Sequence, residues 1–291
     1  MKAFVLVFVS LATSLGHLLE QQPVFSARTD LVRIDVLATD GRGSIAGLGV
    51  EDFEAFDNGV RQQIDRVLSD DASLEAWLVL DQSSSVRDQA EELEDAARTF
   101  LGQLANRDRA GLLTFRHGVT LHFGLSPAPP SPEAISEIRA EGYTSLRDAI
   151  AVALALRDKQ MDRAMVLVLS DGMDNMSWLT EAQLSVSAAR SEAVIYPVAT
   201  PQYEPHTSGA KYLQRIAEQT GGRVVRPEKR KPLSAAFDGV LAEMKSRYVL
   251  TYYPSGTATT GWHDVRVRLK SRAGTVRARR GYYGSDERSF R

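Results

Sequence analysis

A carboxylate and a row of hydroxyls follow one apolar run of the sequence. The segment LVLDQSSSV places Asp81 ahead of Ser83 and Ser85, at alternate positions. Side chains at alternate positions of an extended loop project to the same side, away from the residues between them. Three kinds of chemistry fit these residues: a turn that caps a following helix, a nucleophile, or a cradle of oxygen ligands for a metal ion.

Two further loops carry oxygen ligands. Asp171 comes just after the apolar run AMVLVL, and Thr144 lies in the loop GYTSL that begins a helix. In a doubly wound sheet of order 3-2-1-4-5-6, the strands that lead to Asp81 and Asp171 are neighbours, so we expect the carboxylates to converge. Two carboxylates and three hydroxyls are hard donors that suit Mg²⁺, with Mn²⁺ or Ca²⁺ as alternatives, and not Zn²⁺ or copper. A set with so little negative charge leaves the cation ready to accept a partner's carboxylate.

Together, the three loops resemble a known motif. The metal-ion-dependent adhesion site of von Willebrand factor type A (VWA) domains, DxSxS…T…D, is matched by Asp81-Gln-Ser83-Ser-Ser85, Thr144 and Ser170-Asp171-Gly172. The resemblance covers residues 74–247. It implies that both serines and the threonine bind the cation directly, and that the aspartates bind it directly or through water. It also implies that a Glu or Asp of a protein partner completes the coordination.

The flanking segments resemble those of bacterial secreted proteins that carry a VWA-related domain. The likeness lies in EDFEAFDNG at 51–59, and in YVLTYYP and RRGYYG at 248–254 and 279–284. In VWA relatives, binding at the metal site shifts the last helix. The corresponding helix is predicted here over 233–246 and runs almost directly into a strand, so we expect a shift to tilt the two domains.

The pattern of strands and helices predicts an α/β fold. Continuous apolar runs such as AWLVL and AMVLVL indicate strands covered on both faces, and they alternate with helical patterns. We expect a doubly wound, mostly parallel sheet with helices on both faces. The segments before and after it are typical of short antiparallel strands, and neither is large enough for a core of its own. We therefore expect the α/β domain to be inserted into a small antiparallel β-sandwich.

The predicted boundaries follow these changes of pattern. We assign a signal peptide and leader to 1–27, the two halves of the sandwich to 28–73 and 248–284, the VWA domain to 74–247, and a tail to 285–291. The leader has Lys2 before the apolar run Ala3–Leu15, which is too short to span a membrane comfortably. Cleavage is expected after Gly16 or Ala27.

Composition narrows the class of function. The chain has no cysteine, so an exported fold has no disulfides. Its net charge of -2 gives no general attraction to nucleic acid. No second apolar run has membrane length, so we expect no integral membrane segment after signal cleavage. These features predict a secreted or periplasmic bacterial protein.

The residues favour recognition over catalysis. We expect a module, not an enzyme, that binds a protein partner through a divalent cation held by Asp81, Ser83, Ser85, Thr144 and Asp171. One alternative is a metal-independent structural or assembly factor of the cell envelope. Another is a hydrolase, although the sequence has no GxSxG motif.

Two surface features have alternative interpretations. Four apolar residues after Asp171 fit either a rim that receives a partner or packing against the following helix: Met173, Met176, Trp178 and Leu179. A basic strand face is expected to be solvated, with an anionic glycan or envelope surface as the alternative, and consists of Arg266, Arg268, Lys270, Arg277, Arg279 and Arg280.

Overall fold

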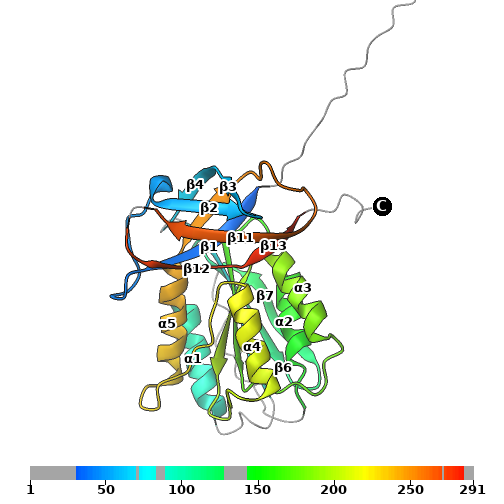
Figure 1. The fold of residues 1–291 in the computed structure, drawn as a ribbon. Coiled ribbons are helices and arrows are strands. Elements are labelled where there is room, and N and C mark those ends of the chain that lie inside the picture. Colours follow the sequence, from blue (N-terminus) through cyan, green and yellow to red (C-terminus); the bar gives the residue numbers. More distant parts are fainter. Residues whose placement is uncertain (1–30, 70–71, 83–88, 128–142, 271, 285–291) are drawn as a thin grey trace, which may run out of the picture.

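The computed structural model describes residues 31–69, 72–82, 89–127, 143–270 and 272–284. The leader at 1–27, the helix expected over 132–140 and the tail at 285–291 lie outside these ranges. Figure 1 shows a lower layered unit of sheet and helices below an upper unit of strands. Within the described ranges, no helix combines the length and the apolar character needed to cross a bilayer.

The lower unit is built on a five-stranded sheet in the order β7-β6-β5-β8-β9. Four strands are parallel, and β7 runs antiparallel to β6 at one edge. Every residue of β5 and β8 is buried, as the apolar runs at 76–80 and 164–169 within them predict. The strands are β5 (Leu74–Asp81), β6 (Arg109–Phe115), β7 (Val119–Ser126), β8 (Arg163–Ser170) and β9 (Val194–Ala199).

Helices cover both faces of this sheet and form two separate cores. On one face, α1 and α5 pack their apolar stripes on the strands, with Phe100 against Phe237. On the other face, α2, α3 and α4 pack around Trp77. The helices are α1 (Ala90–Gly102), α2 (Leu146–Ala155), α3 (Glu181–Ser191), α4 (Ser208–Gln219) and α5 (Leu233–Lys245). The sequence pattern at 223–225 predicts a sixth strand, but the structure has only a single parallel bridge there, between Val198 and Val225.

The upper unit is an antiparallel sandwich of two four-stranded sheets, β12-β1-β10-β4 and β13-β11-β2-β3. Both sheets contribute to one apolar core that includes Ile34, Leu250, Phe53 and Val265. Before the central sheet, the chain forms the sandwich strands β1 (Val32–Thr39), β2 (Phe53–Asp57), β3 (Val60–Gln62) and β4 (Ile64–Leu68), with a 3-10 turn at Val50–Asp52. After α5, it forms the sandwich strands β10 (Tyr248–Tyr252), β11 (Gly261–Leu269), β12 (Thr275–Ala278) and β13 (Gly281–Gly284).

This architecture confirms the expected fold class. A doubly wound sheet interrupts a sandwich whose strands come from both ends of the described chain. The solvated basic face expected on the last strands is only partly correct. Arg266 and Arg268 are exposed, whereas Arg279 is buried and donates to carbonyl groups, among them Gly281 O at 2.8 Å. Arg279 lies between β12 and β13, which belong to different sheets, and its side chain is turned inward there.

A buried cluster of arginines joins the two units at the end of α5. Arg247 is fully buried and donates to the hydroxyl of Tyr196 at 2.9 Å and to Asp35 O on β1 at 3.3 Å. Arg163 donates to Met244 O at 3.1 Å and Lys245 O at 3.0 Å, which are orphan carbonyls in the last turn of α5. The end of α5 is therefore bound to the central sheet and the sandwich at once.

Asp35 on β1 gives this junction a pH dependence. Burial raises the pKa of its carboxyl from 3.8 to about 6, although Arg247 opposes the shift. A carboxyl with a raised folded-state pKa stabilises the fold most below pH 4, and that contribution is lost as the pH rises through 6.

Asp35→Asn should remove this dependence of the free energy of unfolding on pH. Relative to that of the natural chain, the free energy of unfolding of the variant is expected to rise by about 3 kcal/mol between pH 4 and pH 7.5, measured by urea unfolding. Asp65→Asn on β4, at an exposed carboxylate, is the control and should leave the slope unchanged. Parallel pH curves for Asp35→Asn and the natural chain would contradict the assignment.

Candidate functional site

Two predicted ligands lie at neighbouring strand ends of the central sheet. Asp81 is the last residue of β5, and Asp171 directly follows the last residue of β8. The two strands pair in parallel, with Leu80 opposite Leu169. Both carboxylates therefore emerge at the same carboxyl edge, which lies at the end of the molecule away from the sandwich (Figure 1). Asp81 is fully buried and Asp171 is 6% exposed.

The Thr144 loop is tied directly to the Asp171 loop. Thr144 donates its backbone N–H to Oδ1 of Asn175 at 2.9 Å, and its carbonyl accepts from the N–H groups of Asn175 and Met176, both at 3.1 Å. Thr144 itself is 5% exposed. These three hydrogen bonds bring together two segments that the sequence separates by a whole strand and helix.

A second set of contacts locks the start of α2 to the same loop. Asp174 accepts from the backbone N–H of Arg147 at 2.8 Å and forms an ion pair with the Arg147 guanidinium at 3.3 Å. In the other direction, Asp148 accepts from the N–H groups of Trp178 and Leu179 at 2.9 and 3.0 Å. A carboxylate in the first turn of a helix also satisfies the helix dipole, which adds to this attachment.

The Asp171 loop has a local shape that depends on glycine. Oδ1 of Asp171 accepts from the N–H of Met173 at 2.8 Å, which closes a tight turn over Gly172. Gly172 has φ of 90°, in the left-handed region, and a Cβ at Gly209 would stand only 1.9 Å from Gly172 O. The start of α4 therefore packs backbone to backbone against this loop.

Three of the five predicted ligands can thus be placed, and they lie on adjoining segments. Ser83 and Ser85 fall in 83–88, outside the described residues. Among the described residues, no group of three or more His, Cys, Asp or Glu side chains is arranged to hold a metal. The predicted set does not require such a group, because it contains only two carboxylates. Buried carboxylate and hydroxyl oxygens at one edge remain donors of the kind that Mg²⁺ prefers.

Sequence reasoning did not assign the residues that position this edge. From residue type and position alone, Asp174 and Asn175 are turn formers and not ligands, with a supporting contact to the site as the alternative. Nothing in the sequence singles out Arg147 and Asp148. The sequence shows where these residues lie, since DGMDN follows a buried strand and RD begins a helix. It does not show which backbone groups of the other loop their side chains bind.

Apolar side chains around the edge are exposed. Trp178 is 93% exposed, the highest fraction among the large apolar residues described here, and Tyr143, Met173 and Met176 are 61%, 60% and 43% exposed. The interpretation that these residues pack against the following helix is therefore wrong for Met173, Met176 and Trp178. Leu179, the fourth member of the set, is half-buried. Exposed apolar groups gathered on one edge are typical of interaction sites.

Comparisons with known proteins agree with this fold. The family model of the von Willebrand factor type A domain matches residues 76–173. A von Willebrand factor type A protein from Catenulispora acidiphila is similar in structure, with a TM-score of 0.51 and 16% identity over 83% of this chain and 76% of that one. A mutant of the PilB minor pilin from Streptococcus sanguinis has a TM-score of 0.50 and 10% identity over 62% and 63%. An aerotolerance-related membrane protein from Bacteroides fragilis has a TM-score of 0.46 and 14% identity over 59% and 98%.

No curated protein sequence matches the chain. At such identities the matches with TM-scores of 0.51 and 0.50 establish a shared fold and nothing about ligands. The family match covers β5 through the Asp171 loop, which is the segment that contains all five predicted ligands. From the sheet order, the helices on both faces and this match, we conclude that the chain carries a von Willebrand factor type A domain, a type of domain that generally mediates protein–protein interaction.

Proposed function

We propose that the chain is a recognition module, not a catalyst, that binds a protein partner through a divalent cation. Asp81, Ser83, Ser85, Thr144 and Asp171 would hold the cation, with Mg²⁺ as the best fit to hard oxygen donors. The cation supplies a positive charge that attracts an acidic side chain of the partner. The observation that carries the proposal is the placement of Asp81, Thr144 and Asp171 on adjoining buried segments at one sheet edge.

Hydrogen bonding at the carboxyl edge of the central sheet supports a cation site there. Asp171 uses one carboxylate oxygen in its own turn, and no described residue donates a hydrogen bond to the other. The loops that carry Thr144 and Asp171 are held by many backbone contacts, so they need little ordering when a cation binds. A rigid cradle of this kind lowers the entropic cost of binding.

The exposed apolar residues fit the receiving surface for that partner. Tyr143, Met173, Met176 and Trp178 come from the two loops that lead to Thr144 and follow Asp171. An interface commonly combines a central polar contact with large aromatic and Met side chains around it. We place the protein in the periplasm or outside the cell, on the signal-like leader. The metal-independent envelope assembly factor remains the alternative, and a hydrolase is a weaker one.

Cation binding tests the proposal directly. Mg²⁺ should raise the melting temperature of the natural chain and give a measurable heat in titration calorimetry, because it binds the folded state. Asp81→Ala should lose both effects while melting normally in EDTA. Asn175→Ala should bind Mg²⁺ more weakly but still detectably, since it loosens the loops without removing a ligand. Asp95→Asn on α1 removes an exposed carboxylate and should behave like the natural chain. Unchanged Mg²⁺ binding by Asp81→Ala would refute the site.

Partner capture separates the proposed function from its alternatives. Immobilised protein should retain envelope proteins in Mg²⁺ and release them in EDTA, and the Asp81→Ala variant should retain none of these. Retention that is the same in Mg²⁺, in EDTA and with the variant would instead favour a metal-independent assembly factor. Hydrolysis of a substrate that survives purification and is lost with one serine variant would favour an enzyme.

The attachment of α5 suggests how binding could reach the sandwich. Residue 246 separates α5 from Arg247, which contacts both units, and β10 begins at the next residue. Hydrogen exchange over 235–253 should therefore change when Mg²⁺ is added with glutarate, a soluble stand-in for a partner's carboxylate. Exchange in α3, at 181–191, serves as the internal reference. Identical exchange over 235–253 with and without these ligands would exclude the coupling.

A further inference from the structure

A cavity of about 270 Å³ lies between the sandwich and the VWA domain. The sandwich contributes most of its lining, including Arg33 on β1, and the VWA domain contributes Lys159 and Glu192. Two contacts join the units around it, because Arg33 donates to Lys159 O at 3.0 Å and Arg279 donates to Ala189 O in α3. The volume of the cavity is near the lower end of the range for small-molecule sites, roughly 300–1,000 Å³.

Three side chains in the lining have polar atoms that no described residue satisfies. These buried atoms are Nε2 of His263, Nη1 of Arg279 and Oγ1 of Thr257. As whole residues, His263 and Arg279 are only 1% and 6% exposed. Buried polar atoms almost always have a hydrogen-bond partner, and leaving one without a partner is costly. Three such atoms around one cavity indicate that the cavity takes a ligand with polar groups of its own.

A carboxylate fixes the orientation of the His263 ring. Asp57 is fully buried and accepts from Nδ1 of His263 at 2.7 Å, and from the hydroxyls of Tyr252 and Tyr282 at 3.1 and 2.7 Å. Because Asp57 is the acceptor for all three, Nδ1 carries the proton of the ring. The other ring nitrogen, Nε2, faces Gly284, where a Cβ would lie 3.1 Å from it. Gly284 also lines the cavity, so Nε2 lies at the cavity wall beside a residue without a side chain.

Arg279 brings a buried positive charge to the same wall. Its Nε donates to Gly281 O at 2.8 Å and its Nη2 to Ala189 O, so its partners among the described residues are backbone carbonyls. Burial lowers the pKa of the guanidinium below its ordinary value, because the charged form loses its water, and the carboxylates of Glu192 and Asp35 oppose this shift. A buried cation that lacks a carboxylate partner favours an anion beside it.

The lining as a whole carries positive charge. Among its described residues it has three cationic side chains and a single carboxylate, that of Glu192. The cations are those of Arg33, Lys159 and Arg279. Apolar side chains such as Val32 and Pro254 separate the polar groups. A ligand with a negative charge and a compact body matches this wall better than a neutral or cationic one.

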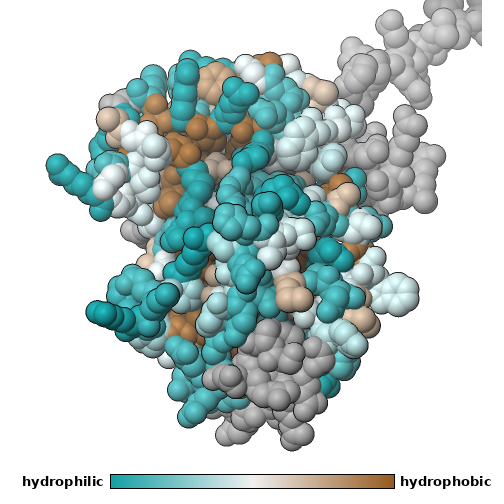
Figure 2. Space-filling view, turned by 60° about the horizontal axis from the view of Figure 1, so that its bottom comes forward, coloured by the Kyte–Doolittle hydropathy of each residue, from teal (hydrophilic) through white to brown (hydrophobic). Residues whose placement is uncertain are grey.

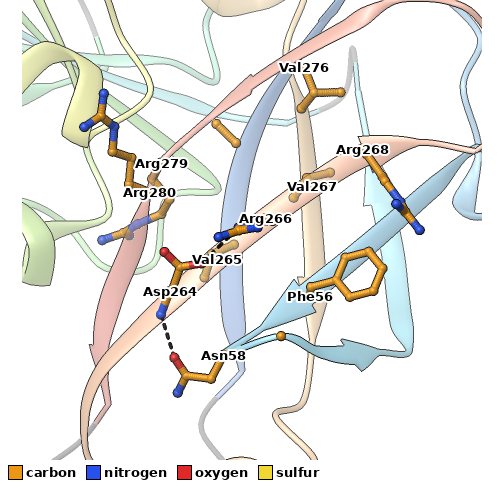
Figure 3. A pocket seen from close by; sticks show the side chains of 12 residues that line it. Phe56, Asn58, Asp264, Val265, Arg266, Val267, Arg268, Val276, Arg279 and Arg280 are labelled. Atoms are coloured by element: carbon orange, nitrogen blue, oxygen red, sulfur yellow. Dashed lines mark hydrogen bonds and ion pairs between the residues drawn. The ribbon is translucent and has the colours of Figure 1, made fainter.

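A larger hollow on the sandwich, of about 850 Å³, differs from this cavity. Hydrophobic residues reach the surface of the sandwich between hydrophilic ones (Figure 2), and β12 packs along β11 beside this hollow (Figure 3). Its exposed arginines already have carboxylate partners. The pairs are Arg266 with Asp264, Arg268 with Glu54, and Arg280 with Glu218. Arg279 also borders the hollow, but its guanidinium is directed away from it, toward α3 (Figure 3).

We propose that the cavity between the two units binds a small organic acid that carries hydroxyl groups, either a sugar acid or a short hydroxy acid. The carboxylate of the ligand accepts from Nη1 of Arg279, and one of its hydroxyls donates to Nε2 of His263. A further hydrogen bond joins the ligand to the hydroxyl of Thr257. Each of the three unsatisfied atoms then has a partner. A ligand with only a carboxylate, or only hydroxyls, would leave at least one of them without.

This cavity is separate from the cation edge. Lys159 and Glu192 lie just before β8 and β9, so the cavity is at the amino edge of the central sheet, opposite Asp81 and Asp171. Because a hydroxy acid can also chelate a cation, binding is measured in metal-free buffer and repeated with Asp81→Ala. Failure of one proposal then leaves the other untouched.

Titration calorimetry with matched ligands tests the chemical class. D-Glucuronate has a carboxylate and hydroxyls on a six-membered ring, D-glucose has the hydroxyls alone, and cyclohexanecarboxylate has the carboxylate alone. L-Lactate and propionate form the corresponding pair of short acids. The natural chain should bind one of the two hydroxy acids at least about tenfold more tightly than its matched ligands. Tighter binding of glucuronate identifies a sugar acid, and tighter binding of lactate identifies a short hydroxy acid.

Variants test the individual contacts. Thr257→Val should melt no lower than the natural chain, since its hydroxyl has no partner to lose, but should bind the preferred acid about fivefold more weakly. Thr251→Val on β10 is the matched control, because it removes another buried hydroxyl without a partner, outside the cavity lining, and should bind normally. His263→Asn keeps an N–H for Asp57 but removes Nε2, and should bind about tenfold more weakly.

Several outcomes would overturn the proposal. These are no binding of either hydroxy acid, equal binding of a ligand that lacks the carboxylate or the hydroxyls, and equal binding by Thr257→Val and Thr251→Val. A crystal structure of the natural chain soaked in the preferred acid should show it against Arg279, His263 and Thr257. Water alone in the cavity of such a crystal would also overturn the proposal.

Discussion

The parallel pairing of β5 with β8 is the constraint on which the rest of the structure depends. It places the ends of two buried strands side by side, so that two carboxylates far apart in the sequence emerge at one edge. The apolar runs at 76–80 and 164–169 are covered on both faces, and burial of every residue fixes their register. The polar residues of the two strands lie outside these runs. Asp81 and Asp171 follow the runs at the carboxyl edge, and both are buried.

Sequence reasoning recovered this pairing because its signals are local and strong. Unbroken apolar runs indicate strands of a covered parallel sheet, and the motif residues lie directly after them. The sequence also predicts the N-cap of α3, because Thr180 precedes a helical pattern, and in the structure its side chain accepts from the N–H of Gln183. The prediction of a sixth strand at 223–225 was wrong, because three residues that follow two glycines are too few for a ladder, and only one bridge forms.

The arrangement of the loops could not be read in the same way. Asn175 reaches the backbone of Thr144, and Asp148 reaches the backbone beyond Asp174, across segments distant in sequence. Asn and Asp are also common turn formers, so their residue type does not reveal the longer contact. Arg279 shows the same difficulty in the sandwich. Alternation along a strand predicts an exposed side chain, but Arg279 lies in the connection between β12 and β13, which belong to different sheets, and its guanidinium is buried.

Burying arginines at the junction has a cost that its hydrogen bonds must offset. A buried charge without partners is strongly unfavourable, and Arg247 and Arg163 spend most of their donors on carbonyl oxygens and a phenol. Such contacts require defined geometry, unlike an apolar interface that tolerates sliding. The junction therefore joins the end of α5 to β1 and to the central sheet in one orientation. The strand ends that carry Asp81 and Asp171 lie at the end of the molecule away from the sandwich, so this directional joint fixes how the sandwich is oriented relative to that edge.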